Sequence, residues 1–376
     1  MNSPLALLSQ LTPAQFLTEY WQKKPLLIRQ AIPNFKGLLT PNELAGLSCE
    51  EDVQSRIIQQ QNKKWQVKQG PFCAHDFTKL PEKDWTLLVQ NVNHHLPEAA
   101  ELLKKFNFIP HARLDDLMVS YAPDGIGIGP HFDSYDVFLL QGSGKRNWKI
   151  SSQQDFNLNK DAPLKVITDF VAEQEWTLEA GDMLYLPPQF AHCGMAVGED
   201  CMTYSIGFRA PKAQELIHEF LIYLQDNTSA EGLYADPELS LQQHPAEIGN
   251  LMVEKVKQIL EKITWDKSDV GEFLGRYLTE PKPDVFFEPP RKIMVADFAK
   301  KLSKKPLLLN LKSQMLFQQN AFYINGESFA VPTPLIDCIQ HLADQRFLDT
   351  VSLNRIEQQA LANTLYEAYI AGYVNF

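Results

Sequence analysis

Long hydrophobic runs are absent from this chain. None of its apolar stretches reaches the ~18 residues that a membrane-spanning helix needs, which argues against a helical membrane protein. The first eight residues also lack a basic segment followed by a long apolar core, so we expect no signal peptide. We therefore expect a cytoplasmic protein with no membrane partner.

Cysteine is scarce, and the spacing of the cysteines does not indicate a metal site. The five cysteines are dispersed, and none forms a Cys-x-x-Cys pair. An odd, scattered set predicts reduced thiols rather than a disulfide framework. Cys193 adjoins His192 in the sequence, but neighbouring residues of a strand face opposite ways, so we do not expect Cys193 to be a ligand.

Positive charge is also in short supply. The chain has 35 Lys and Arg against 46 Asp and Glu, which gives a net charge of −11 at pH 7. Binding to a nucleic-acid backbone needs positive charge, so direct nucleic-acid binding is disfavoured. The acidic balance would instead suit a basic protein partner through electrostatic steering.

The first 210 residues alternate short apolar runs with turn residues. A helix is expected from Thr12, a favourable N-cap followed by Pro13, and a strand is expected over 24–29. Further short strands are expected at 117–121, 137–141, 148–150, 183–186 and 202–208. Such a series predicts a β-sandwich or jelly-roll barrel. Gly142-Ser143-Gly144 predicts a hairpin between two of these strands.

A helical period begins near residue 211. Apolar residues recur at helical spacing over 213–226 and again over 246–263, which predicts two amphipathic helices. From the residues alone, two roles for these helices are equally supported, a lid on the barrel and a dimer interface. A proline-rich linker follows near 280–291.

The last 85 residues or so suggest a small separate domain. Helices are expected near 295–302, 334–342 and 353–371, with strands at 307–311 and 321–324. This order resembles a winged-helix module. Its last helices carry few basic residues, so we favour a structural or protein-contact role over DNA binding. The predicted organisation is a barrel over 1–210, a helical region over 211–280 and a winged-helix-like domain over 281–376.

The strongest chemical signal is His131-Phe132-Asp133 together with His192. Residues two apart in a strand point to the same face, so His131 and Asp133 should lie side by side, and His192 on a later strand would complete a set of three. Two histidines and one carboxylate form the facial triad of non-haem Fe(II) oxygenases. The glycine-rich loop 124–130 before the pair lets backbone approach a ligand closely.

Arg146 and Ser120 are the expected anchors of an acidic co-substrate. Arg146 lies beyond the predicted hairpin, where its guanidinium could pair with the far carboxylate of a 2-oxoacid chelated by the metal. Trp148 should share its face and wall the pocket, whereas Lys145 should point away. Ser120 could donate a hydroxyl to the same carboxylate, although it could equally be a strand-surface serine.

These motifs together resemble a known family. The residues that carry the resemblance are Tyr20–Leu26, Ser120–Gly125, His131–Phe138, Gln141–Trp148, Gly181–His192 and Tyr204–Pro211. In order and spacing the chain is similar to JmjC-type 2-oxoglutarate oxygenases, and among them to the bacterial ribosomal oxygenases that hydroxylate an arginine of ribosomal protein L16. The resemblance covers the whole chain.

The resemblance implies an α+β fold and a mechanism. The expected fold is a double-stranded β-helix (the jelly-roll or cupin barrel of JmjC proteins), with a helical region that forms a homodimer and a C-terminal winged-helix domain. Carried over residue by residue, the Fe(II) ligands fall on His131, Asp133 and His192, and the 2-oxoglutarate anchor falls on Arg146. O₂ is the second co-substrate. Aspartate in the triad, rather than glutamate, fits the hydroxylases of this superfamily.

An arginine substrate needs an anion near the pocket mouth. Asp124 and Asp136 are the predicted contacts for its guanidinium, with Tyr135 as a wall, although Asp124 could equally be a turn residue. The implied partner is L16 or a similar basic protein. Two alternatives stay open, a JmjC lysine demethylase and a non-catalytic metal-binding cupin whose winged helix contacts DNA.

Overall fold

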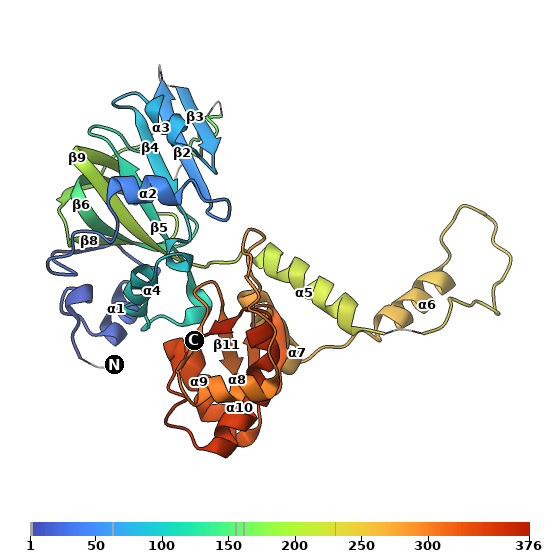
Figure 1. The fold of residues 1–376 in the computed structure, drawn as a ribbon. Coiled ribbons are helices and arrows are strands. Elements are labelled where there is room, and N and C mark those ends of the chain that lie inside the picture. The colour runs from blue at the N-terminus through green and yellow to red at the C-terminus, as the bar shows by residue number, and fades with distance from the viewer. Residues whose placement is uncertain (1–2, 62–63, 155, 161, 230) are drawn as a thin grey trace.

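The computed structural model describes residues 3–61, 64–154, 156–160, 162–229 and 231–376 (Figure 1). The strands of the N-terminal half are β1 (Leu26–Ile28), β2 (Ser55–Gln61), β3 (Lys64–Gln69), β4 (Trp85–Val89), β5 (Leu114–Ala122), β6 (Asp136–Ser151), β7 (Gln174–Leu178), β8 (Met183–Leu186) and β9 (Ala191–Phe208). Its helices are α1 (Pro13–Glu19), α2 (Pro41–Leu47), α3 (Ala74–Thr78) and α4 (Pro97–Lys104), with short 3₁₀ turns η1 (Ala6–Leu8), η2 (Val92–His94) and η3 (His111–Arg113).

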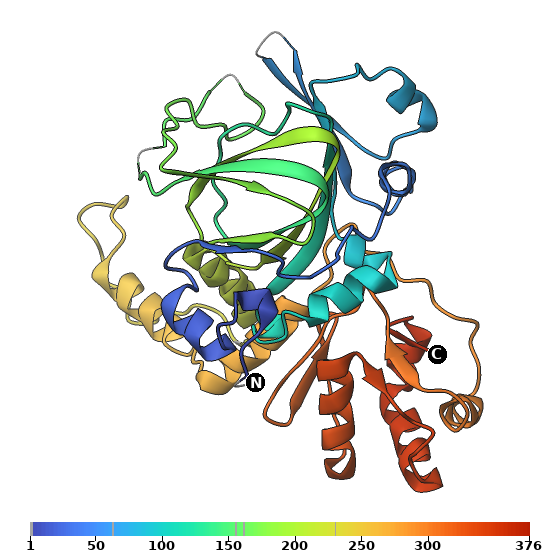
Figure 2. The same cartoon turned by 90° about the vertical axis from the view of Figure 1, so that its left-hand side faces the viewer.

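These strands form one antiparallel sheet that curls into a jelly roll. The order is β1-β8-β6-β9-β5-β4-β2-β3, with β7 added beside β6. Figure 2 shows the long central strands curving around a barrel interior, while α1 and α4 lie outside it. The jelly-roll barrel expected from the sequence is therefore confirmed. The helix predicted at Thr12 is confirmed as well, because Thr12 caps α1 by accepting a hydrogen bond from the backbone N–H of Gln15.

The hairpin predicted at Gly142-Ser143-Gly144 is wrong. β6 runs through this segment without turning and stays paired with β9 on both sides, with register shifts on either side of Ser143. The glycines serve a bulge instead. A Cβ on Gly142 would lie 2.4 Å from the Tyr204 ring, and Gly144 has φ +60°, a conformation that favours glycine.

Alternation along β6 divides the barrel into two sides. Phe138 and Leu140 pack into the main apolar core beneath α1 and α4, whereas Val137 and Leu139 belong to a separate cluster that includes Trp148. The main core is rich in aromatic rings, and Tyr185 stands within 5.0 Å of both the Phe16 and Phe138 rings, centroid to centroid. This outer core holds the strands in place, so the opposite side can be hollow.

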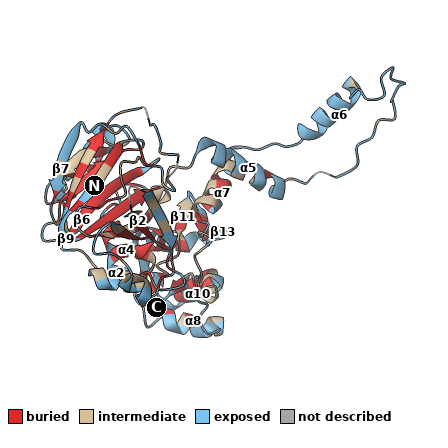
Figure 3. Cartoon of the chain, turned by 90° about the horizontal axis from the view of Figure 1, so that it is seen from above, coloured by how far each residue is buried: buried red, intermediate tan, exposed pale blue. Residues whose placement is uncertain are grey.

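The helical segment after the barrel projects from the body of the molecule. It contains α5 (Ala213–Asn227), α6 (Asn250–Leu260) and α7 (Lys267–Thr279). Figures 1 and 3 show α6 standing well clear of the barrel, with almost all of its surface exposed. α7 instead packs against the C-terminal domain, where Gly275 meets the ring of Tyr323.

The C-terminal domain has its own apolar core. Its elements are α8 (Val295–Leu302), β10 (Leu307–Leu309), β11 (Met315–Gln318), β12 (Ala321–Ile324), β13 (Glu327–Phe329), η4 (Thr333–Leu335), α9 (Ile336–Gln345), β14 (Phe347–Leu348), α10 (Arg355–Ile370) and β15 (Val374–Asn375). The strands form two small sheets, β14-β10-β15 and β11-β12-β13. Helices α8, α9 and α10 enclose the core with them, in the order of helices and strands that the sequence predicted.

Polar contacts join this domain to the barrel. Lys312 Nζ lies 2.7 Å from Asp52 Oδ2, and Gln314 Nε2 donates to the His111 carbonyl at 3.2 Å. Over the described residues, no helix is both long and apolar enough to cross a bilayer.

Candidate active site

The three predicted metal ligands meet on the hollow side of the barrel. One ligand atom from each of His131, Asp133 and His192 lies within 4.8 Å of the others. His192 is the second residue of β9. The sequence predicted that His131 and Asp133 also lie on a strand, and this is wrong. They lie in the loop before β6, where His131 forms an isolated bridge with His192 through two backbone hydrogen bonds of 2.9 and 2.8 Å. The bridge, rather than strand alternation, brings the ligands together.

Hydrogen bonds orient both imidazoles toward a common point. His131 Nδ1 lies 2.9 Å from the Gly129 carbonyl, and His192 Nδ1 lies 2.9 Å from the Phe190 carbonyl. A carbonyl can only accept, so each Nδ1 carries the proton and each Nε2 keeps its lone pair for a metal. His192 Nε2 stands 3.6 Å from Asp133 Oδ2. Burial, with a further contribution from His131, lowers the pKa of His192 to about 4, so this imidazole is neutral at pH 7.

This donor set fits an Fe(II) ion. Two imidazoles and one carboxylate on one side of a cavity are the ligands of non-haem Fe(II) oxygenases, with positions left over for co-substrates. The cavity beside them has a volume of about 400 Å³, enough for small ligands. Glycine is required at position 127, behind the cavity wall, because a Cβ there would lie 1.8 Å from the carbonyl oxygen of Gly194, which lines the cavity.

Arg146 reaches the same cavity from β6. Its side chain is 3% exposed, and among the described residues its Nε and Nη2 have no hydrogen-bond partner. A buried guanidinium without a partner is costly, so the arrangement suits an anionic ligand. Trp148 also lines the cavity, and the guanidinium lies 5.7 Å from its ring. Lys145 points outward to Glu179, as expected from alternation.

The register of β6 and β9 sets the span between Arg146 and the triad. Arg146 is opposite Ala196, Trp148 is opposite Gly194, and Ile150 is opposite His192. Four residues of strand correspond to about 13 Å, a gap that an arginine side chain and a short dicarboxylate can bridge together. Trp148 lies between the two ends, and Gly194 leaves room for it, because a Cβ there would lie 2.5 Å from the ring.

Ser120 and Tyr135 also line the cavity. Ser120 is 6% exposed on β5, opposite Thr203 of β9. Tyr135 follows the triad loop and is 38% exposed, so it stands near the opening. Burial, with the nearby charge of Asp133, raises the pKa of Tyr135, so the phenol is protonated at any working pH. The structure thus brings both residues to the pocket that holds the triad.

Asp136 does not reach the pocket, which corrects the prediction for this residue. It is fully buried on the outer side of the barrel, where Tyr185 donates to Oδ1 at 2.7 Å and Gln22 donates to Oδ2 at 2.9 Å. Arg113 Nη2 adds an ion pair at 3.4 Å. The cause is alternation, because its neighbour Val137 faces the cavity.

Asp124 is likewise absent from the pocket wall. Its Oδ1 accepts a hydrogen bond of 2.7 Å from the backbone N–H of Gly198, in the part of β9 where the register with β6 shifts. Asp124 lies in a turn, which agrees with the alternative to substrate contact, and its side chain binds the backbone of β9. In an exposed loop there is no regular alternation of side chains from which to predict where the Asp124 side chain points. The sequence therefore could not decide between the two roles.

Sequence reasoning missed the acidic pair that does line the pocket. Asp115 and Asp116 stand at the start of β5, and both border the cavity together with Arg56 of β2. Asp116 is 7% exposed, and burial with the adjacent Asp115 charge raises its pKa to about 6. The sequence could have predicted Asp116 as a pocket residue, because residues 116 and 120 are four apart on one strand and share a face.

Comparisons with known proteins agree with this architecture. Residues 101–216 match the model of a JmjC domain, and residues 262–375 match that of a ROXA-like winged helix. The chain is 35% identical over 328 residues to the ribosomal protein uL16 3-hydroxylase of Escherichia coli K12, covering 86% of this chain and 87% of that protein.

Two solved structures show the same arrangement throughout. The crystal structure of Escherichia coli ycfD matches with a TM-score of 0.85 and 32% identity over the full length of both chains. A structure of YcfD, described as a ribosomal oxygenase, in complex with cobalt and 2-oxoglutarate matches with a TM-score of 0.82 and 33% identity, covering 96% of this chain and 97% of that one.

Proposed function

Since the chain belongs to the family of JmjC-domain ribosomal oxygenases, we propose that it hydroxylates an arginine side chain of ribosomal protein L16 (uL16) with Fe(II), 2-oxoglutarate and O₂. The observation that carries this proposal is one cavity that combines three groups: a two-histidine, one-carboxylate triad, a buried guanidinium whose Nε and Nη2 have no partner among the described residues, and a pair of carboxylates at the cavity edge. Each group matches one component of the reaction.

His131, Asp133 and His192 are the proposed iron ligands. Their Nε2 atoms and carboxylate converge, and the two Nδ1–H groups are fixed by the carbonyls of Gly129 and Phe190. When bound, Fe(II) supplies the oxidising chemistry that couples decarboxylation of 2-oxoglutarate to hydroxylation of an unactivated C–H bond. The protein supplies the geometry and keeps bulk water away from the reacting carbon.

Arg146 is the proposed anchor for the distal carboxylate of 2-oxoglutarate. Its unpartnered Nε and Nη2 would each donate to a carboxylate oxygen, which satisfies the guanidinium and fixes the orientation of the co-substrate. Ser120 is a proposed further donor to the same carboxylate from β5. Trp148 and Leu139 provide an apolar wall along the carbon chain.

Asp115 and Asp116 are the proposed contacts for the substrate guanidinium. Both line the cavity that contains the triad, and Tyr135 stands at its opening. Arginine presents five donors in a fixed fork, which two adjacent carboxylates can accept together. An acidic mouth also fits the net charge of −11, because a basic ribosomal protein would be steered toward it.

A homodimer is proposed from the projecting helices. The apolar stripe of α6 is exposed to solvent, with Met252 46%, Val253 50% and Leu260 58% exposed. Ile217 and Leu221 on α5 are also more than half exposed. An apolar surface of this kind is costly in water, and a second copy of the same arm would cover it. Among the described residues, none from α5 or α6 lines the active-site cavity, which disfavours a lid.

The proposed substrate also bears on location and on nucleic acid. Ribosomal proteins are found in the cytoplasm, so we propose that the enzyme is cytoplasmic. The winged-helix domain is proposed to make protein contacts rather than to bind DNA, since the chain as a whole is acidic.

The test compares peptides that differ by one charge. Succinate formation is measured with Fe(II), 2-oxoglutarate and an arginine peptide of L16, and again with citrulline, the neutral analogue, at the arginine position. We expect Asp116→Asn to raise KM for the arginine peptide about 10- to 100-fold, because a hydrogen bond to a charged group is lost. The citrulline peptide should be a poor substrate of the unaltered enzyme.

Asp124→Asn is the matched control, because this carboxylate is held by the backbone of β9 outside the cavity. It should keep the KM of the unaltered enzyme. Equal turnover of the arginine and citrulline peptides would contradict an arginine substrate. Formaldehyde release from methyl-lysine peptides, without turnover of the arginine peptide, would favour a demethylase instead.

A further inference from the structure

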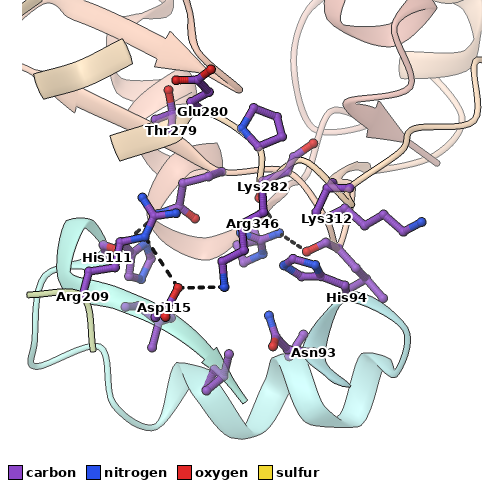
Figure 4. Close-up of a pocket in the computed structure, with 18 of the residues that line it drawn as sticks. Asn93, His94, His111, Asp115, Arg209, Thr279, Glu280, Lys282, Lys312 and Arg346 are labelled. Carbon is purple, nitrogen blue, oxygen red and sulfur yellow. Dashed lines mark hydrogen bonds and ion pairs between the residues drawn. The ribbon is translucent and has the colours of Figure 1, made fainter. Parts of the chain in front are cut away.

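Asp115 belongs to two cavities at once. It borders the active-site cavity, and it also borders a second, smaller cavity of about 80 Å³ where the barrel meets the C-terminal domain. Figure 4 shows this second cavity, with Asp115 and Asn93 on the barrel side and Lys282, Lys312 and Arg346 on the side of the C-terminal domain. One carboxylate therefore stands between the junction of the domains and the proposed substrate site.

Two cations hold one oxygen of this carboxylate. Lys282 Nζ lies 2.9 Å from Asp115 Oδ1, and Arg209 Nε lies 3.6 Å from the same oxygen (Figure 4). Over the described residues, no ion pair or hydrogen bond engages Oδ2. A carboxylate can accept on both oxygens, so the pairing fixes Asp115 and leaves Oδ2 for a further donor.

Lys282 itself is held firmly although it comes from a distant part of the chain. It follows α7 in the linker to the winged-helix domain, and prolines at 281 and 283 restrict the backbone on both sides. Its Nζ also donates to Asn91 Oδ1 at 3.1 Å. The linker to the C-terminal domain thus contributes a charge beside the active-site pocket of the barrel.

We propose that Lys282 is a positioning residue for the cationic substrate side chain. It holds Asp115 at the border of the pocket, so that the linker to the winged-helix domain helps to set the affinity for the substrate. This inference rests on the proposed arginine substrate. It assigns to the C-terminal part of the chain a role in substrate binding that the barrel alone would not have.

Loss of Lys282 has two opposing effects on substrate affinity. It removes a cation that repels the substrate guanidinium, and it removes the ion pair that holds Asp115 in place; we expect the second effect to be the larger. A cation near the pocket repels a guanidinium, but this charge is already offset by Asp115 Oδ1 at 2.9 Å. Without it, the Asp115 charge acts on the buried Asp116 carboxyl with less compensation, which disfavours ionisation of Asp116. The charged groups that act on Asp116 are Asp115, Lys282 and Arg56, and of these only Asp115 opposes its ionisation.

The experiment compares two lysine-to-glutamine variants of the full-length enzyme. Lys282→Gln should raise KM for the arginine peptide about fivefold, a size typical of coupled neighbours, with kcat changed less than twofold. The increase should be largest near pH 6 and should shrink toward pH 8.5, where Asp116 ionises without help. Lys282→Arg should restore the original KM. Peptide-independent turnover of 2-oxoglutarate should stay constant in all variants.

Lys312→Gln is the matched control. Lys312 also joins the domains through an ion pair, at 2.7 Å to Asp52, but Asp52 does not line the active-site cavity. It should leave KM and its pH profile unchanged. Lys282→Met retains the apolar stem and serves as a second variant if the glutamine variant folds poorly.

Three results would overturn the proposal. These are an unchanged or lower KM in Lys282→Gln, an equal increase in Lys312→Gln, and a KM effect of Lys282→Gln that persists in an Asp115→Asn background. The last result would show that Lys282 does not act through Asp115. If the unaltered enzyme turns over 2-oxoglutarate but not the arginine peptide, the proposed substrate has failed, and the inference about Lys282 falls with it.

Discussion

Arg146→Met removes the one group on β6 that is proposed to recognise 2-oxoglutarate by charge. The guanidinium is 3% exposed, and its Nε and Nη2 have no partner among the described residues. Methionine keeps most of the apolar stem that packs beside Trp148. The substitution therefore tests charge recognition with little change in volume.

The structure predicts opposite effects on the free protein and on the complex. In the free protein an unpaired buried charge is unfavourable, so its removal should leave the free energy of unfolding unchanged or higher. In the complex, the loss of a paired charge should cost about 3 kcal/mol. That corresponds to an increase in the Kd for 2-oxoglutarate on the order of 100-fold.

Thermal unfolding measures both effects without turnover, with Co²⁺ in place of Fe(II). A ligand at 100 times its Kd stabilises a protein by about 2.7 kcal/mol. At the same concentration the Arg146→Met variant would be at its Kd and would gain only about 0.4 kcal/mol. Lys145→Met is the matched control, because that side chain pairs with Glu179 on the outer face. It should keep the full ligand-induced rise in Tm.

The reasoning would be refuted by a variant that unfolds at lower temperature yet keeps the full 2-oxoglutarate shift. Arg146 would then be a structural residue. Arg56 offers a direct comparison, since it lines the same cavity and its buried Nε also has no partner among the described residues. If Arg56→Met abolishes the shift and Arg146→Met does not, the co-substrate is anchored from β2 instead of β6.

Three further predictions follow from packing, exposure and charge. Gly194→Ala places a Cβ 2.5 Å from the Trp148 ring, so we expect about 1–3 kcal/mol lower stability and a higher KM for 2-oxoglutarate; an unchanged Tm would contradict the packing. Val256→Glu on the exposed face of α6 should convert a dimer to a monomer in light scattering, and a monomeric unaltered protein would refute the dimer. Burial and the Asp115 charge raise the pKa of Asp116 from 3.8 to about 6. Between these pH values the folded protein keeps a proton on Asp116 that the unfolded chain has lost, so the free energy of unfolding falls as pH rises through this range. Asp116→Asn should remove that component from the measured pH dependence of stability, and an identical slope would contradict the assignment.

The sequence predicted the metal ligands more reliably than the reason for their convergence. His131, Asp133 and His192 do come together, but a backbone bridge between the loop before β6 and the start of β9 aligns them, whereas the sequence predicted that His131 and Asp133 lie on a regular strand. Arg146 reaches the pocket as expected, although β6 has no hairpin before it. Motif order fixes which residues meet, whereas local backbone geometry is decided by tertiary packing.

The residues proposed to contact the substrate show where the alternation of side chains along a strand predicts their position and where it does not. The phase set by Ser120 could have identified Asp116, and the phase of β6 could have excluded Asp136. Asp115 could not have been predicted in this way. A register shift between Leu114 and Leu117 interrupts regular pairing with β9 at this point, and both members of the acidic pair reach the pocket edge. The contact with Lys282 joins residues 167 positions apart, beyond any local pattern.

The most direct test of the proposed activity is mass spectrometry of an L16 peptide after incubation with the enzyme, Fe(II) and 2-oxoglutarate. We expect a gain equal to one oxygen atom, located on arginine by fragmentation and absent with Asp133→Ala, in which one of the three converging ligands is lost. An unmodified arginine, in a preparation that binds Fe(II) and converts 2-oxoglutarate to succinate, would contradict the proposed substrate. An equal gain with Asp133→Ala would contradict the assigned metal site.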